Sequence, residues 1–349
     1  MERRKSRKIA VGNIFIGGDA PVTVQSMLNK PARDIQASVA QAVALEKAGC
    51  EIIRAAVPDM ESVKLISALK KSVSVPIVAD IHFDYRLALA SIAEGVDKIR
   101  INPGNIGSAD RVKAVADACK INGIPIRIGV NSGSVEKEIL AKYGSPCARA
   151  LVESAMYHAS LLEKFDFENI VISIKSSNVP VMIEAYRIAA QECDYPLHLG
   201  VTEAGTYNSS LIKSSIGIGS LLADGIGDTV RVSITDDPVK EVAAAQDILH
   251  ALGLGKPRPD IVSCPTCGRT KIDLISLANQ VESRLRSCDR QIKVAVMGCA
   301  VNGPGEAREA DIGIAGGDGC ALIFKKGEII CKVSEDEAVD RLIEEIGKL

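Results

Sequence analysis

Three cysteines have the spacing of a metal site. Cys264 and Cys267 form the CxxC of "SCPTCGR", a turn tight enough for both thiolates to face one metal. Cys299 follows 32 residues later in "VMGCAVNGPGEA", where the glycines allow the backbone to approach a bound group closely. Zinc knuckles and redox dithiols also use CxxC, but the third cysteine favours a metal centre. The seven other cysteines lie mostly in apolar or helical stretches, which predicts buried thiols.

The spacing leaves two metals open. Structural zinc needs four nitrogen or sulfur ligands, and no fourth Cys or His is well placed in the sequence. An iron–sulfur cluster accepts three cysteines and leaves one iron for a substrate or a weaker oxygen ligand. Glu306, seven residues after Cys299, is a carboxylate that a substrate oxygen could displace. The spacing favours the cluster, with zinc as the alternative.

Cations form a second chemical group, because five of them lie near the ends of five different strand-like runs. They are Arg54, Arg100, Arg127, Lys175 and Arg231. The obvious acids nearby are Asp80 and Glu203, and two acids cannot pair five cations. Burying an unpaired cation costs several kcal/mol, so the pattern predicts a polyanionic ligand, a phosphate or diphosphate. The alternative is an internal ion-pair network with further acids.

Further polar side chains fall on the same faces of these runs, because alternate residues of a strand share a face. They are Asp80, His82, Asn102, Asn131, Ser173, Ser177 and Ser233. We expect these faces to line the lumen of a barrel, at the end where barrel enzymes carry their active sites. Glu203, in "VTEAG", is a candidate acid–base group, with an ion pair to an arginine as the alternative.

The elements that position these residues are read from the hydrophobic pattern. Eight short β-branched runs between residues 22 and 235 alternate with amphipathic stretches, which predicts a (β/α)8 TIM-type barrel over residues 1–255. After the Gly- and Pro-rich stretch 253–260 the pattern changes to helix, strand, glycine-rich loop, strand, hairpin and helix. Residues 256–349 are therefore expected to form a small α+β domain that carries the cysteines.

Composition excludes several classes of protein. A net charge of −2 and 3% aromatic residues argue against a nucleic-acid or anionic-membrane partner. The basic N-terminus has no signal-peptide pattern, and no apolar run could span a membrane. A cytoplasmic location is expected, so the ten cysteines should be reduced thiols or metal ligands rather than disulfides.

Taken together, the motifs resemble those of the (E)-4-hydroxy-3-methylbut-2-enyl diphosphate synthase family, iron–sulfur enzymes of non-mevalonate isoprenoid biosynthesis. The resemblance covers nearly the whole chain, and "SCPTCGRT" followed by "MGCAVNGPGEAREADIGIAGG" behind a barrel is highly specific. The other matching stretches are "VQSM", "RINPGNIG", "IRIGVNSGS", "VISIKSS", "HLGVTEAG" and "GIGDTVRVS". About 30 residues separate Arg231 from Cys264, which corresponds to the two-domain form of the family.

The resemblance implies a 4Fe–4S cluster on Cys264, Cys267, Cys299 and Glu306. It implies the substrate 2-C-methyl-D-erythritol 2,4-cyclodiphosphate, bound by its diphosphate at the barrel mouth and opened by two-electron reductive dehydroxylation. Electrons would come from flavodoxin or ferredoxin. Glu203 would donate a proton to the departing hydroxyl, and Asn302 would position substrate or ligand. A head-to-tail homodimer is also implied, with each site closing between one subunit's barrel and its partner's cluster domain.

Two alternatives from other functional classes stay open at this point. One is a phosphate-binding barrel enzyme, a pterin-type synthase or an aldolase, with a structural zinc domain. The other is a non-enzymatic iron–sulfur sensor or scaffold with a vestigial barrel. Five strand-end cations argue against the second, because a vestigial barrel has no need of them.

Overall fold

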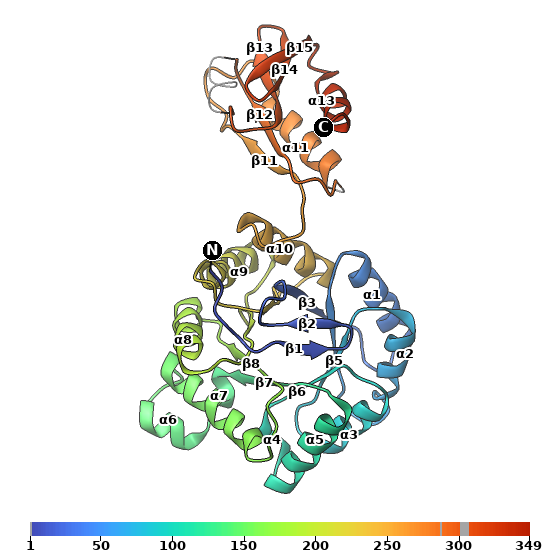
Figure 1. The fold of residues 1–349 in the computed structure, drawn as a ribbon, viewed down its shortest axis with the longest axis vertical. Helices are drawn as coiled ribbons and strands as arrows, with labels where there is room; N and C mark the ends of the chain where they lie inside the picture. Colours follow the sequence, from blue (N-terminus) through green and yellow to red (C-terminus); the bar gives the residue numbers. More distant parts are fainter. Residues whose placement is uncertain (1, 287, 301–306) are drawn as a thin grey trace. The chain divides into compact units, whose positions relative to one another are not determined.

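The chain forms two compact units in the computed structural model, Met1–Gly255 and Lys256–Leu349. The structure describes residues 2–286, 288–300 and 307–349. Figure 1 shows the first unit as a ring of strands surrounded by helices, and the second as a smaller sheet with helices beside it. The predicted fold class, a TIM-type barrel followed by a small α+β domain, is confirmed.

The barrel has eight parallel strands, and the sequence predicted each of them. They are β3 (Thr23–Met27), β4 (Ile52–Ala56), β5 (Ile77–Asp80), β6 (Lys98–Ile101), β7 (Ile126–Asn131), β8 (Ile170–Lys175), β9 (His198–Leu199) and β10 (Thr229–Val230). Pairing of β10 with β3 and a parallel bridge between Ile172 and Leu197 close the ring. The Ile and Val side chains that alternate with the lumen positions pack against the helices in one large core.

Helices follow the strands around the outside of the barrel. They are α1 (Ile35–Lys47), α2 (Lys64–Ser72), α3 (Tyr85–Ala93), α4 (Pro103–Ile106), α5 (Ala109–Asn122), α6 (Lys137–Tyr143), α7 (Ala148–Glu163), α8 (Val179–Glu192), α9 (Tyr207–Ala223) and α10 (Pro238–Ala251). Asp34, Asp84 and Asn178 accept hydrogen bonds from the first turns of α1, α3 and α8. These caps fix the point at which each loop from the barrel's C-terminal end becomes a helix.

A short antiparallel hairpin precedes the barrel, and the sequence did not predict it. Its strands β1 (Ile9–Val11) and β2 (Ile14–Ile16) cross the end of the ring in Figure 1. Three of its apolar side chains pack against Ile52, Val78 and Val171, which point into the lumen at the N-terminal ends of their strands. Strands of three residues carry too little alternation to be recognised in a basic N-terminal segment.

The second unit is a five-stranded mixed sheet with two helices on one face. Its strands are β11 (Asp260–Ser263), β12 (Lys293–Met297), β13 (Ile312–Gly317), β14 (Cys320–Lys325) and β15 (Glu328–Val333), and its helices are α11 (Leu274–Leu285) and α13 (Ala338–Gly347). Both helices share an apolar core with β12, β13 and β14. The sequence missed β11, because its four residues directly follow a Pro-rich stretch that was interpreted as the domain boundary.

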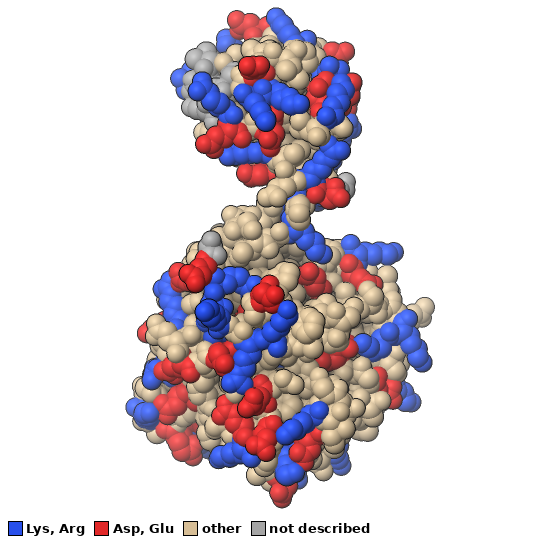
Figure 2. Space-filling model, viewed as in Figure 1, with Lys and Arg blue, Asp and Glu red and all other residues tan. Residues whose placement is uncertain are grey.

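Surface charge is mixed, in agreement with the near-neutral total. Figure 2 shows basic and acidic side chains interspersed over the visible face of the barrel unit. No helix among the described residues is long and apolar enough to cross a bilayer.

Candidate active site

Lumen side chains of the barrel lie in stacked rings, each drawn from alternate strands. From the hairpin end upward, the register gives Ile52, Lys98, Val171 and Thr229; then Gln25, Val78, Arg127 and His198; then Arg54, Arg100, Ser173 and Arg231. The apolar members lie near the hairpin, and the cations increase in number toward the C-terminal ends of the strands. The strand register therefore places the predicted cations in one confined space.

Asp80 holds two of these cations. Its carboxylate lies 2.6 Å from Nη2 of Arg54 and 3.2 Å from Nη1 of Arg100, and all three side chains are buried. Burial alone would raise the pKa of Asp80, but the charge of Arg54, a contact with His82 and the charge of Arg100 outweigh it and hold the pKa well below its usual range. Burial lowers the pKa of Arg54 to about 10 even so.

Arg231 is paired by an acid that the sequence did not identify. Glu241, in the first turn of α10, is buried and lies 3.1 Å from Nη2 of Arg231. It also accepts a hydrogen bond from the hydroxyl of Ser26 at 2.8 Å. Its position in a helical pattern gives no sign in the sequence that it reaches a strand end. Arg54, Arg100 and Arg231 thus each have a carboxylate partner within the barrel unit.

Arg127 and Lys175 have no carboxylate partner among the described residues. Arg127 is fully buried, and its Nη1 donates only to Oε1 of Gln25, at 3.2 Å. Its Nε and Nη2 atoms have no hydrogen-bond partner within the described part of the chain. Burial, followed by the nearby charge of Arg54, lowers the pKa of both Arg127 and Lys175 well below their usual values.

Lys98 is a sixth lumen cation, and sequence reasoning missed it. It lies two residues before Arg100 on β6, is fully buried, and its Nζ has no partner in the described chain. Burial and the charges of Arg127 and Arg54 lower its pKa well below the usual value. Continuing the alternation one step down the strand from Arg100 would have revealed it. Among the described residues, six cations therefore face two buried carboxylates, and the lumen carries excess positive charge.

The remaining predicted residues lie at or beyond the C-terminal ends of the strands. Asn102 is buried and Asn131 is half-buried, at the ends of β6 and β7, and Ser173 is buried within β8. His82 and Ser177 are exposed in loops, and Ser233 is half-buried. These side chains surround the end of the lumen where the cations gather.

Glu203 stands apart from the arginines. It is exposed in the loop after β9, and its carboxylate makes no ion pair with a described arginine. Its φ of 52° lies in the left-handed region, which is unfavourable for a residue with a side chain. Backbone strain of this kind occurs at functional sites, but Asp166 and Lys326 share it, so the role of Glu203 stays a prediction.

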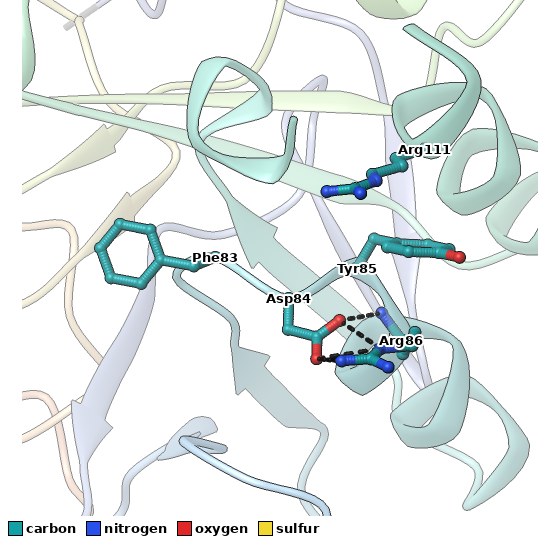
Figure 3. A pocket seen from close by; sticks show the side chains of 5 residues that line it. All are labelled: Phe83, Asp84, Tyr85, Arg86 and Arg111. Carbon is teal, nitrogen blue, oxygen red and sulfur yellow. Dashed lines mark hydrogen bonds and ion pairs between the residues drawn. The ribbon is translucent and has the colours of Figure 1, made fainter. Parts of the chain in front are cut away.

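A hollow in the rim beside His82 is shown in Figure 3. It is lined by Phe83, Asp84, Tyr85, Arg86 and Arg111. Arg86 pairs with Asp84 at 2.7 Å, and the guanidinium of Arg111 lies 5.6 Å from the centre of the Tyr85 ring. Asp84 and Arg86 are thus paired with each other, and Arg111 contacts an aromatic ring.

The cysteines of the second unit lie on two adjoining loops. Cys264 follows β11, and its sulfur accepts a hydrogen bond from the N–H of Gly298 at 3.1 Å. The N–H of Lys271 donates to the carbonyl of Gly298 at 2.8 Å, which ties the CxxC loop to the loop of Cys299. Cys267 is exposed, and hydrogen bonds from the backbone and side chain of Arg269 lower the pKa of its thiol. The two loops that carry the three predicted cysteines therefore adjoin at one end of the sheet.

Two predicted residues of this region, Asn302 and Glu306, lie outside the described residues. Within residues 2–286, 288–300 and 307–349, no three His, Cys, Asp or Glu side chains are grouped closely enough to hold a single metal ion. Soft thiolate donors suit iron or zinc rather than magnesium or calcium. In a four-iron cluster each cysteine binds a different iron, so its ligands need not converge on one point.

Both units match one protein family. The GcpE TIM-barrel domain matches residues 6–246, and the GcpE protein C-terminal domain matches residues 260–348. The chain belongs to the GcpE family. This agrees with the resemblance drawn from the motifs, and it favours that family over the zinc-domain and scaffold alternatives.

Close relatives of this GcpE-family chain carry one enzyme name, 4-hydroxy-3-methylbut-2-en-1-yl diphosphate synthase (flavodoxin). A Clostridium perfringens protein is 60% identical over 98% of both chains, and one from Clostridium acetobutylicum is 59% identical over 100% of both. A Fusobacterium nucleatum relative is 58% identical over 99% of this chain and 97% of its own. The family and full-length similarity are therefore established.

Solved structures share the barrel at low sequence identity. Dihydropteroate synthase from Stenotrophomonas maltophilia is 17% identical with a TM-score of 0.52, covering 71% of this chain and 97% of its own. 3-Dehydroquinate dehydratase from Geobacillus kaustophilus is 14% identical with a TM-score of 0.52, covering 72% of this chain and 99% of its own. At this identity the likeness concerns the fold alone.

Proposed function

We propose that this chain reductively opens 2-C-methyl-D-erythritol 2,4-cyclodiphosphate to (E)-4-hydroxy-3-methylbut-2-enyl diphosphate, with flavodoxin as the electron donor. The full-length relatives named for this synthase support the reaction and the donor. The observation that carries the proposal is the excess of buried cations over carboxylates in the lumen. A diphosphate supplies the missing negative charge.

Diphosphate binding is assigned to the cations that retain free donors. Arg127 and Lys175 have no carboxylate partner among the described residues, and Arg54 keeps Nη1 and Nε without partners there. Guanidinium groups bind phosphate oxygens in a bidentate fashion, which fixes the orientation of the substrate. Side chains around the mouth would bind the rest of the substrate. They are His82, Asn102, Asn131, Ser173, Ser177 and Ser233.

The C-terminal unit is assigned a 4Fe–4S cluster on Cys264, Cys267, Cys299 and Glu306. The adjoining loops of the CxxC pair and of Cys299 support this assignment. The hydrogen bond from the N–H of Gly298 to the sulfur of Cys264 supports it too, because such hydrogen bonds stabilise a thiolate. When bound, the cluster would supply single electrons and a Lewis-acidic iron. This half of the site contributes the redox chemistry that no amino-acid side chain offers.

Proton transfer is assigned to the chain itself. Glu203 delivers the proton that lets the substrate hydroxyl leave as water, and Asn302 orients the substrate. The exposed carboxylate of Glu203 and its strained backbone support this role. We also propose a head-to-tail homodimer, in which a barrel and the partner's C-terminal unit form each site. Mixing inactive Arg127→Met and Cys299→Ser proteins should then restore part of the activity, because a mixed dimer has one intact site.

The function is tested with protein purified without oxygen. We expect about four iron and four sulfide per chain, and turnover of the cyclic diphosphate with reduced flavodoxin. Glu203→Gln should retain the iron and lose turnover. One zinc per chain without sulfide would contradict the cluster, and a cluster-loaded protein without turnover would contradict the reaction.

A further inference from the structure

His158 is a fully buried histidine that no role described above uses. It lies on α7, which packs against β7 and β8 on the outside of the barrel. Burying an imidazole removes its hydrogen bonds to water, so a polar partner is needed to offset the loss. The contacts of this ring lead to two loops of the candidate active site.

The first contact is with Gly104, in the loop after β6. A Cβ atom on Gly104 would lie only 2.6 Å from Cε1 of His158, so the ring fills the space that any larger residue would need. The N–H of Gly104 donates to Oδ1 of Asn102 at 3.1 Å. The ring therefore supports the backbone unit that orients the Asn102 side chain.

The second contact is with Glu136, in the loop after β7. Nε2 of His158 lies 2.6 Å from Oε1 of Glu136, so the two polar groups are in direct contact, although their geometry is not that of a regular hydrogen bond. Glu136 immediately precedes α6 and follows Asn131 through the single 3-10 turn Ser132–Ser134. The side chain of Glu136 makes no capping hydrogen bond to α6, so its carboxylate is directed at the histidine instead.

The protonation state of the ring is consistent with this contact. Burial lowers the pKa of His158 below its usual value, although the charge of Glu136 opposes the shift. Burial thus favours the neutral form of the ring. Neither Nδ1 nor Nε2 makes a regular hydrogen bond within the described part of the chain, so the contact with Glu136 is the polar contact that the ring has there.

We propose that His158 is a positioning residue: one ring fixes the loops after β6 and β7 and so sets Asn102 and Asn131 at the mouth of the barrel. The inference rests on the proposed function for one point, the identity of the ligand that Asn102 and Asn131 bind. The ordering of the loops does not depend on that ligand. His158 thus contacts both loops from the outer side of the barrel, on the side away from the lumen cations.

The test compares two substitutions of His158 with one control in the cluster-loaded enzyme. His158→Phe keeps a ring beside Gly104 and removes the polar atom that faces Glu136, whereas His158→Gln keeps a polar N–H group. Ser154→Ala, one turn earlier on α7 and equally buried, controls for a general disturbance of the helix. The readouts are KM, kcat and hydrogen–deuterium exchange of the backbone amides of residues 103–107 and 132–136.

For His158→Phe we expect faster exchange in residues 132–136 and a KM for the cyclic diphosphate about tenfold higher, with kcat within about threefold. His158→Gln should recover most of the KM, and Ser154→Ala should match the wild type. Unchanged exchange and KM in His158→Phe would show that the ring only fills space, and would overturn the proposal. A fall in kcat with unchanged KM would overturn it too.

A second variant covers a failure of His158→Phe to fold. Glu136→Ala removes the same contact from the partly exposed loop side and should give the same exchange and KM changes. Wild-type behaviour of Glu136→Ala would overturn the proposal. If the wild-type enzyme does not turn over the cyclic diphosphate, the proposed function fails, while the exchange comparison still decides whether His158 orders the loops.

Discussion

The barrel lumen and the cysteine loops are prepared for their ligands in opposite ways. In the lumen, Arg127 and Lys98 are completely buried by strand register, with no carboxylate beside them in the described chain. In the second unit, Cys264 and Cys267 lie on loops at the surface of the unit, connected to the Cys299 loop by a few backbone hydrogen bonds. The lumen therefore carries a desolvation cost in the folded protein before any ligand binds, and Cys264 and Cys267 carry no comparable burden.

This difference indicates where binding free energy can come from. An anion entering the lumen relieves charge repulsion that already exists in the folded protein, so binding and stability are linked. The cysteine loops contribute binding free energy through their bonds to a metal instead. Substitutions in the two regions should therefore have separable effects on anion binding and on metal binding, and the following predictions test this.

The largest effect is expected from Cys299→Ser. A hydroxyl is a poor ligand for iron in a thiolate site, so turnover with reduced flavodoxin should fall more than about 1000-fold and the iron content should drop. The barrel does not depend on the cysteine loops for its charge, so binding of inorganic diphosphate, measured by calorimetry, should stay within about threefold. Cys331→Ser, on β15, is the matched control and should keep its iron. Loss of diphosphate binding together with the iron would break the comparison.

Next is Arg127→Met, which should act on binding and stability in opposite directions. Affinity for the cyclic diphosphate should weaken by about 2–5 kcal/mol, because a desolvated charge contact is lost. The ligand-free protein should unfold at a higher temperature, because an unpaired buried cation has been removed. Arg33→Met, at an exposed surface pair, should change neither quantity. Unchanged affinity would place Arg127 among the structural residues instead.

A smaller effect is expected from Glu241→Gln. It leaves the half-buried Arg231 without its counter-charge, and the free energy of unfolding should fall by about 3 kcal/mol. Adding Arg231→Met should recover most of this loss, which denaturant titration of the single and double variants can measure. Asp236→Asn, which breaks an exposed pair with Lys240, should cost under about 1 kcal/mol. If Glu241→Gln and Asp236→Asn lowered the free energy of unfolding equally, the burial of Glu241 would not contribute to the strength of its pair with Arg231.

The smallest effect concerns Lys98 and pH. Its folded-state pKa lies well below its unfolded value of about 10.4, so between the two values the unfolded chain binds more protons. The free energy of unfolding that the neutral side chain of Lys98 permits at high pH is therefore lost as the pH falls from about 10 toward the folded pKa. Lys98→Met should remove the slope and be more stable than the wild type by about 1–2 kcal/mol at neutral pH. If the free energy of unfolding changed with pH in the same way in Lys98→Met and in the wild type, Lys98 would have a partner that stabilises its charge.

Much of this arrangement could be predicted from local sequence. β-Branched runs gave all eight barrel strands, and period-two alternation placed Arg54, Arg100 and Arg127 correctly in the lumen. Motif resemblance identified the family, which spacing alone could not separate from a zinc protein. These successes share one cause, because each pattern repeats over several residues or recurs along the chain.

The missed features depend on contacts between distant segments. Glu241 lies in a helical pattern, and only the folded barrel brings it to Arg231. His158 lies in a helical run as well, and its partners Gly104 and Glu136 are 54 and 22 residues away. Lys98 is different, because the alternation that located Arg100 also reaches it. That residue could have been found from the sequence.

The hairpin of β1 and β2 makes the lumen a dead end. Its apolar side chains pack against the lowest ring, so we expect ions, water and the proposed diphosphate to enter and leave at the opposite end of the lumen. Any small anion that neutralises the lumen cations in the resting protein must leave by this route before a diphosphate can take its place. Ordinary salt therefore competes with the substrate for entry, and association should slow as chloride concentration rises.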